Sequence, residues 1–151
     1  MKFSVNQQDL QKSLGYCQGV IEKRSTLQIL SNVLLEINSG HLTVTATDLD
    51  LIFIHKISNV EILEEGKTTT SSSIMYDIVR KISSGSKISF SNPSESKLQL
   101  ESEKSIFNLN CISASEFPLT DENFNQNEFS MHSKDLLTVS YTHLRAHETT
   151  L

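Results

Sequence analysis

The sequence is poor in the residues that build several common kinds of site. Its 151 residues include no tryptophan, two prolines, five glycines and two cysteines. Cys17 and Cys111 stand far apart with no C-x-x-C partner, which disfavours a disulfide framework and a cysteine-rich metal site. No apolar run is long enough for a membrane span, and the N-terminus lacks the features of a signal peptide. We therefore expect a soluble protein of the reducing cytoplasm.

Motifs for catalysis are also missing. The chain contains no nucleophile elbow and no phosphate-binding glycine loop. Asp48 and Asp50 come nearest to paired carboxylates, but no base or metal ligand accompanies them, so turn and surface roles are favoured. Cys17 on an apolar helical stripe and Cys111 at a strand end are expected to be core residues rather than reactive thiols. The sequence predicts a protein that is not an enzyme and holds no metal or cofactor.

The charge balance is acidic, with 18 Asp and Glu against 13 Lys and Arg and a formal net charge of −5. Any affinity for nucleic acid must therefore come from local basic patches on an acidic surface. The length suits one domain, and a hydrophobic content of 37% suffices for one modest core.

Periodicity predicts a mixed α+β chain. Leu10, Leu14, Cys17 and Ile21 follow a helical stripe after Asn6, a good N-cap, while Lys12, Ser13 and Tyr16 fall on its polar side. A second helix, capped by the serines at 71–73, carries its apolar set at Ile74, Met75, Ile78, Val79 and Ile82. Alternation predicts strands at residues 2–5, 33–37, 42–46, 51–57, 68–70, 87–90, 97–100 and 106–112.

The rest of the chain suggests a second domain that has only begun. Residues 1–115 are predicted to form one domain, and 116–127, acidic and rich in asparagine, a linker. Residues 128–138 then repeat the opening order of strand, cap and helix.

The last segment, residues 139–151, differs in composition. His143 and His147 are spaced i, i+4 with Glu148 beside them, yet the Glu placement of H-E-x-x-H and a third ligand are missing. Val139–Thr149 resembles, at every position, the translation of a transposase adapter used in sequencing libraries. We interpret 139–151 as a non-native tail fused to a truncated gene. A small metal-dependent enzyme built on the His pair stays as a minor alternative.

Basic side chains collect on the two predicted helices and at the end of the first. They are Lys12, Lys23, Arg24, Arg80 and Lys81. A solvated helical face would show the same pattern, and the residues alone favour that interpretation over phosphate contacts.

Short motifs along the chain carry a family resemblance. They are Met1-Lys2-Phe3, Arg24-x-Thr26-Leu27-x-Ile29-Leu30, Thr47-Asp48-Leu49-Asp50, Thr68-Thr69 before Asp77-Ile78, and Phe117-Pro118. In this order, from Met1 to about Leu137, the chain resembles the N-terminal domain of the bacterial DNA polymerase III beta subunit family, the sliding clamps. Each motif is weak alone, and their collinearity makes the resemblance specific.

The resemblance implies a DNA-clamp fold, with antiparallel sheets and two amphipathic helices on the DNA-facing side. It implies a head-to-tail homodimer of three-domain subunits that encircles double-stranded DNA without reading its sequence. Such a ring is a non-catalytic processivity factor that tethers the replicative polymerase during strand elongation. The polymerase III catalytic subunit and the clamp loader would bind through later domains that this chain does not contain, and no membrane is involved.

The resemblance also assigns roles to residues. Lys12, Arg24, Arg80 and Lys81 become candidate phosphate neighbours, with Arg24 foremost because it matches the family's DNA-contacting arginine position. Lys104, Phe107 and Leu109, on the last strand of the domain, are expected at the dimer interface. Ile74 and Ile106 stand where the family resemblance leads us to expect basic residues, which places the supporting ion pairs of that interface in doubt.

The alternative to a clamp is a β-rich extracytoplasmic binding module. It would explain the many Ser and Thr residues and the short strands. It also requires a signal peptide, which is not seen, and exposed aromatic binding residues, whereas aromatics make up only 7% of the chain.

Overall fold

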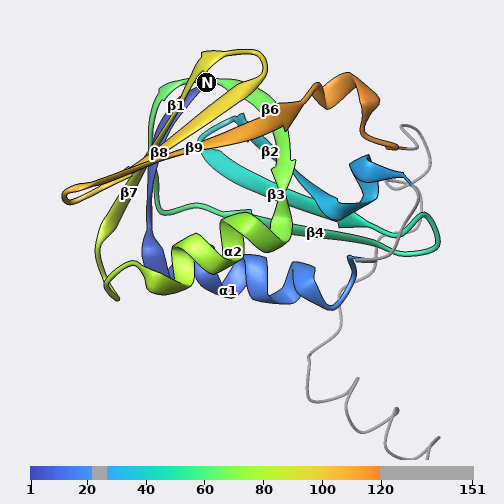
Figure 1. The fold of residues 1–151 in the computed structure, drawn as a ribbon, viewed down its shortest axis with the longest axis horizontal. Helices are drawn as coiled ribbons and strands as arrows, with labels where there is room; N and C mark the ends of the chain where they lie inside the picture. The colour runs from blue at the N-terminus through green and yellow to red at the C-terminus, as the bar shows by residue number, and fades with distance from the viewer. Residues whose placement is uncertain (22–26, 120–151) are drawn as a thin grey trace, which may run out of the picture. The chain divides into compact units, whose positions relative to one another are not determined.

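The structure, a computed structural model, describes residues 1–21 and 27–119 (Figure 1). The helices are α1 (Gln7–Gln18) and α2 (Ser72–Lys81), with 3-10 turns η1 (Gln28–Ser31) and η2 (Ala114–Glu116). The strands are β1 (Lys2–Asn6), β2 (Asn32–Asn38), β3 (His41–Thr47), β4 (Ile52–Ile57), β5 (Val60–Glu64), β6 (Gly66–Ser71), β7 (Lys87–Ser94), β8 (Lys97–Ser102) and β9 (Ser105–Ile112). The predictions for 120–127, 128–138 and 139–151, including His143, His147 and Glu148, lie outside the described residues.

The strands pair in the order β4-β3-β2-β6-β9-β8-β7-β1-β5, and every ladder is antiparallel. Among the described residues, strand pairing joins the two halves of this order only between β6 and the last residues of β9, at Thr69–Ile112 and Thr70–Cys111. The two helices lie side by side, below the sheet in the view of Figure 1. This arrangement confirms the predicted α+β fold with antiparallel sheets and two helices.

Both predicted helix caps are present. The Asn6 side chain accepts a hydrogen bond from the Gln8 backbone N–H at 2.9 Å, and Ser71 Oγ accepts one from Ile74 at 3.4 Å. Each cap satisfies a backbone donor that the first turn of a helix cannot satisfy itself. The strand-to-helix transitions at both places are therefore fixed locally by the sequence.

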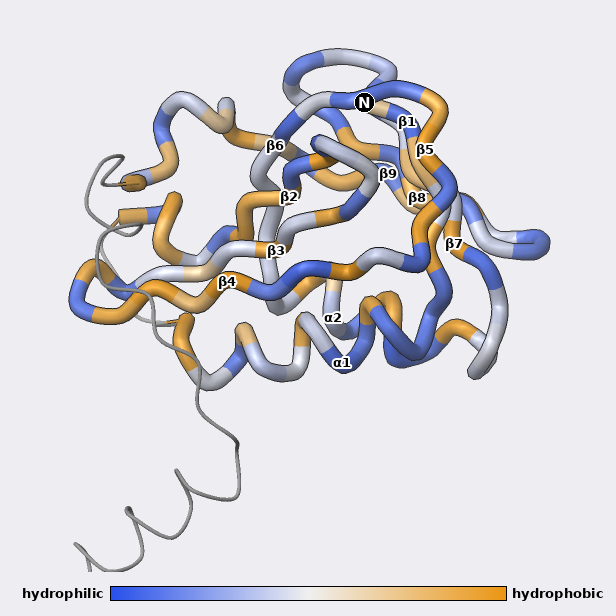
Figure 2. Tube along the Cα trace, turned by 180° about the vertical axis from the view of Figure 1, so that it is seen from behind, coloured by the Kyte–Doolittle hydropathy of each residue, from blue (hydrophilic) through white to orange (hydrophobic). Residues whose placement is uncertain are grey.

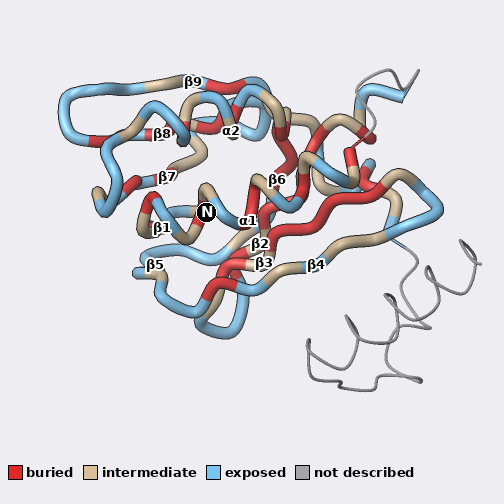
Figure 3. Tube along the Cα trace, turned by 90° about the horizontal axis from the view of Figure 1, so that it is seen from below, coloured by how far each residue is buried: buried red, intermediate tan, exposed pale blue. Residues whose placement is uncertain are grey.

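The core lies between the sheet and the buried sides of the helices. Leu10, Leu14 and Cys17 of α1 are buried in it as predicted, and Figure 3 shows further buried positions along β2 and β3. Figure 2 shows hydrophobic and hydrophilic positions along α1, as expected of an amphipathic helix. Two assignments were wrong: Ser13, placed on the polar side, is fully buried, and Ile74, placed in the apolar set, is 53% exposed.

The strand β5 was not predicted. It pairs with β1 at the end of the strand order, with Phe3 opposite Ile62, and its own residues are half-buried or exposed. An edge strand with little burial lacks the strong alternation that identifies a strand from sequence. The strand β5 forms because it pairs with β1, and that pairing exists only in the folded domain.

Gly66 begins β6 in a position that suits glycine alone. Its φ is +154°, and an added Cβ would lie 2.9 Å from Met1 Cβ. We expect Gly66→Ala to lower the free energy of unfolding by about 2 kcal/mol, through backbone strain and this contact together. Gly40, with φ +86° and open space around it, is the matched control, and its alanine variant should lose about 1 kcal/mol. Urea unfolding followed by circular dichroism measures both, and equal losses would show that Met1 yields without cost.

Candidate nucleic-acid interface

The two helices are fixed against each other at both ends. Near one end, Gln7 Nε2 donates to the Val79 carbonyl oxygen at 2.8 Å. Near the other, Gln18 Nε2 donates to Ser72 Oγ at 3.0 Å. Between them Gly15 of α1 faces Tyr76 of α2, where an added Cβ would be in ordinary van der Waals contact, 3.7 Å from the hydroxyl oxygen. The outer sides of α1 and α2 therefore form one continuous surface.

An open groove of about 530 Å³ runs along this surface. Its lining is Gln8, Gln11, Lys12, Gly15, Tyr16 and Tyr76. Among these described residues Lys12 carries the single formal charge, and no carboxylate takes part. Amide and phenol groups can donate hydrogen bonds to phosphate oxygens, and one ammonium supplies weak attraction. On a chain of net charge −5, this groove has one cationic and no anionic side chain in its lining.

Arg80 and Lys81 lie in the last turn of α2, and Arg80 contacts Tyr76, which lines the groove. Arg80 Nη2 donates to Asp77 Oδ1 at 2.8 Å, and its guanidinium carbon lies 5.0 Å from the centre of the Tyr76 ring. Lys81 is exposed. Their position has a structural explanation as well, because cations in a last turn interact favourably with the helix dipole.

The structure thus brings three of the four candidate phosphate neighbours, Lys12, Arg80 and Lys81, onto the same pair of helices. Arg24 falls within residues 22–26, outside the described residues, so its role stays a prediction. Sequence reasoning did not find Tyr76, which lies beside both the groove and Arg80. The sequence analysis assigned Tyr16 only to the polar side of the first helix. Its spacing of four residues from Lys12 already placed both side chains on the same face.

The strand β9 presents an open edge. It pairs with β8 along Ser105–Asn110, whereas among the described residues only Cys111 and Ile112 also pair with β6. One side of Ser105–Leu109 therefore has backbone groups free to pair with a strand from elsewhere. Figure 1 shows β8 and β9 extending together beyond the rest of the sheet.

The predicted interface residues are placed differently along this strand. Lys104 is exposed in the turn before β9, and Phe107 is half-buried against the core. Leu109 is 7% exposed and lies opposite Leu98, so its side chain is part of the domain's own core. Ile106 is 59% exposed and is the most accessible apolar side chain on this edge among the described residues.

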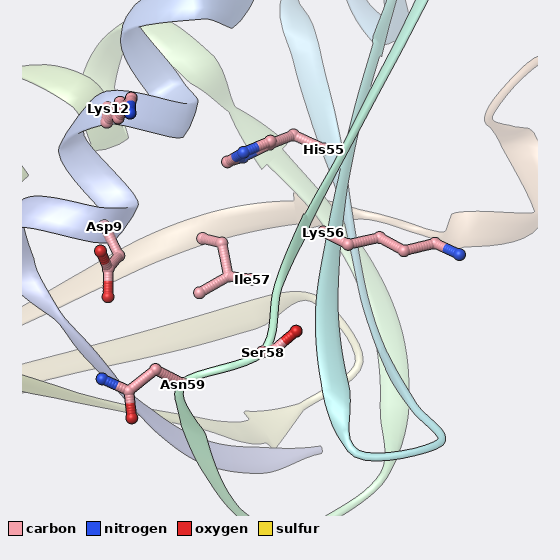
Figure 4. Close-up of a pocket in the computed structure, with 7 residues that line it drawn as sticks. All are labelled: Asp9, Lys12, His55, Lys56, Ile57, Ser58 and Asn59. Atoms are coloured by element: carbon pink, nitrogen blue, oxygen red, sulfur yellow. The ribbon is translucent and has the colours of Figure 1, made fainter. Parts of the chain in front are cut away.

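A second cavity, of about 260 Å³, lies between α1 and β4 (Figure 4). Asp9 and Lys12 reach it from α1, while the His55 ring points toward α1 and Lys56 points away. His55 packs on Phe53 and Tyr16, with ring centroids 6.2 and 6.0 Å apart. The charges around this cavity are mixed, so it does not extend the carboxylate-free surface.

The residues considered for chemistry have structural roles. Asp48 Oδ1 accepts hydrogen bonds from the backbone of Asp50 and Leu51 at 3.0 and 2.7 Å, the turn role predicted for it. Burial raises the pKa of the Cys17 thiol to about 12, which makes it unreactive at neutral pH. Across residues 1–21 and 27–119, no three His, Cys, Asp or Glu side chains are grouped to hold a metal ion. Neither helix in this part of the chain is long and apolar enough to cross a membrane.

Comparisons with known proteins agree with the fold and the order of motifs. Residues 1–121 match the sequence model of the family described as DNA polymerase III beta subunit, N-terminal domain. The chain is 32% identical over 138 residues to the beta sliding clamp of Caulobacter vibrioides NA1000, covering 91% of the chain and 37% of that relative. With the beta sliding clamp of Escherichia coli K12 it shares 34% identity over 131 residues, covering 87% and 36%.

Solved structures give the same result. The DNA polymerase III subunit beta from Pseudomonas aeruginosa superposes with a TM-score of 0.82 at 29% identity, covering 90% of this chain and 37% of that one. The Caulobacter crescentus pol III beta structure gives a TM-score of 0.76 at 35% identity, covering 82% and 33%. The chain spans about a third of the length of these relatives. It belongs to the DNA polymerase III beta subunit family and corresponds to the N-terminal domain of that family.

Proposed function

We propose that the chain is the first part of a ring-shaped sliding clamp. The complete protein would encircle duplex DNA and tether the replicative polymerase during elongation, in the cytoplasm, without catalysing a reaction itself. Family membership supports this proposal, and one observation on the structure carries it. Two helices fixed side by side present a groove with Lys12 and no carboxylate, on a chain whose net charge is −5.

The physical logic concerns how a ring holds DNA. A closed ring retains DNA topologically, so its inner surface needs only weak attraction for phosphates that is independent of sequence. We expect Lys12, Arg80 and Lys81 to supply it from α1 and α2, and Arg24 remains the fourth predicted contact. An acidic exterior does not conflict with this arrangement.

The open edge of β9 would receive a strand from a second subunit, arranged head to tail. Backbone pairing along Ser105–Leu109 would extend the sheet across the interface. Lys104 and Phe107 would contact the partner directly, whereas Leu109, from inside the core, would support the strand. Exposed Ile74 and Ile106 would add apolar contact where the family resemblance leads us to expect charge.

Two further partners follow from the family rather than from this surface. We propose that the polymerase III catalytic subunit and the clamp loader bind the later domains of the complete protein. The 151-residue chain alone would bind neither through them.

Retention on circular DNA tests the proposal. We expect the complete protein to stay with a nicked circular plasmid through gel filtration at physiological salt and to be lost when the plasmid is linearised. The 151-residue chain should be retained on neither form, because it cannot close a ring. Salt-resistant retention of the short chain, or equal retention of the complete protein on linear DNA, would contradict topological binding.

A further inference from the structure

We propose that Asp77 limits the attraction of the helical surface for DNA by holding Arg80 in an ion pair. Arg80 would then be a partly neutralised phosphate contact, whereas Lys12 has no ion-pair partner among the described residues. This inference rests on the proposed function, because it concerns the strength of binding at the same surface.

The geometry around Arg80 is the first support. One guanidinium nitrogen, Nη2, lies 2.8 Å from Asp77 Oδ1, and the guanidinium carbon lies 5.0 Å from the Tyr76 ring centre. Contact with the aromatic face confines the guanidinium near the carboxylate. The side chains of Arg80 and Asp77 are 50% and 58% exposed, so a phosphate can reach both.

The contrast with Lys12 is the second support. Among the described residues Lys12 has no carboxylate within ion-pair distance, and it lies in the groove that Tyr76 also lines. Tyr76 therefore connects a free cation on α1 with a paired cation on α2. Asp9 lines the neighbouring cavity together with Lys12 but forms no ion pair with it, whereas Asp77 pairs directly with Arg80.

A phosphate that approaches Arg80 meets attraction and repulsion together. The pair Arg80–Asp77 has no net charge, so a phosphate there displaces few counterions and adds little to the salt dependence of binding. The guanidinium keeps further N–H donors beyond the one that faces Asp77, so it can still orient a phosphate oxygen. Such a contact guides DNA without holding it, which suits a protein that must slide.

The test is an Asp77→Asn variant of the 151-residue chain, which keeps the shape of the side chain and removes its charge. Titration of ¹⁵N-labelled protein with a short DNA duplex detects weak binding through amide shifts along α1 and α2. We expect about threefold tighter binding at low salt and a slope of log affinity against log salt that is steeper by about 0.9, equivalent to one added phosphate contact.

Two controls separate the ion pair from general charge effects. Glu95→Gln, at the exposed turn between β7 and β8, makes the same charge change away from the helices and should leave the affinity unchanged. In an Arg80→Gln background, Asp77→Asn should no longer steepen the slope. An equal steepening with and without Arg80, or none in either, would overturn the inference.

The same titration distinguishes failure of this inference from failure of the proposed function. If the duplex shifts amides on α1 and α2 in the unmodified chain, the DNA-facing surface stands whatever Asp77 does. If no amide on either helix shifts in any variant, the surface itself is wrong, and the role given to Asp77 is overturned with it.

Discussion

Replacing Phe90 by alanine is expected to lower the free energy of unfolding by about 3 to 5 kcal/mol. Phe90 of β7 lies directly opposite Phe3 of β1, and their rings stack with centroids 4.8 Å apart and an interplanar angle of 3°. Both side chains are at most 1% exposed. The substitution would remove the ring, break the cross-strand stack and leave a cavity that the surrounding sheet cannot close.

The expected loss is large relative to the stability of a single domain. Small domains are stable by about 5 to 15 kcal/mol, so Phe90→Ala would consume a substantial part of that margin. Urea unfolding followed by circular dichroism gives the free energy directly. Phe53→Ala is the matched control, because Phe53 is half-buried on the edge strand β4 and should lose less than half as much. Equal losses at Phe53 and Phe90 would show that the stack of Phe3 and Phe90 is not central to the core.

Elements whose cause is local were predictable from the sequence. Asn6 and Ser71 cap helices whose apolar stripes repeat at the helical period, and both caps form as expected. The apolar stripe does not show how far the buried side of a helix extends around it. For that reason Ser13 and Ile74 were assigned to the wrong sides of their helices. Ser13 lies at the margin of the stripe of α1, and only the packing of that helix determines that the margin is covered.

The sequence placed candidate cations on the two helices but did not give their surroundings. The helical period of the surrounding apolar residues placed Lys12, Arg80 and Lys81 on helices. The family resemblance then proposed DNA phosphates as their partners. The hydrogen bonds of Gln7 with Val79 and of Gln18 with Ser72 join helices that are far apart in sequence. The pairing of Arg80 with Asp77 depends on side-chain geometry. Neither follows from a periodic pattern.

For β9, too, some features could be predicted from the sequence and others depend on the folded sheet. Alternation predicted β9, and the resemblance predicted its role as an edge. The register that sets Leu109 opposite Leu98, and so buries it, is a property of the folded sheet. A one-residue shift would reverse the faces of the strand, so the exposed side of β9 could be assigned only from the structure.

The junction between β6 and β9 depends on buried hydroxyl groups as well as on the backbone. Thr69 Oγ1 donates to the Ile112 carbonyl oxygen at 2.6 Å and accepts from Asn32 Nδ2 at 3.2 Å. Thr70 Oγ1 donates to the Asn110 carbonyl oxygen at 2.9 Å. Because few residue pairs join the two strands here, these side chains contribute much of the connection between the halves of the sheet.

Thr69→Val is therefore expected to lower the free energy of unfolding by about 2 kcal/mol, since it removes the buried acceptor of the Asn32 amide and the hydroxyl donor to the Ile112 carbonyl oxygen. Hydrogen exchange at the amides of β9 should also accelerate, because the strand loses its attachment to β6 before the whole domain unfolds. Ser4→Ala is the control: its hydroxyl pairs with Ser89 at an exposed site, where water replaces it, and the loss should stay below about 0.5 kcal/mol. If the two variants lose the same stability, the backbone ladder alone holds the junction. If Thr69→Val loses the expected stability, the hydroxyl of Thr69 helps to fix the open edge of β9 in the orientation that a second subunit would meet.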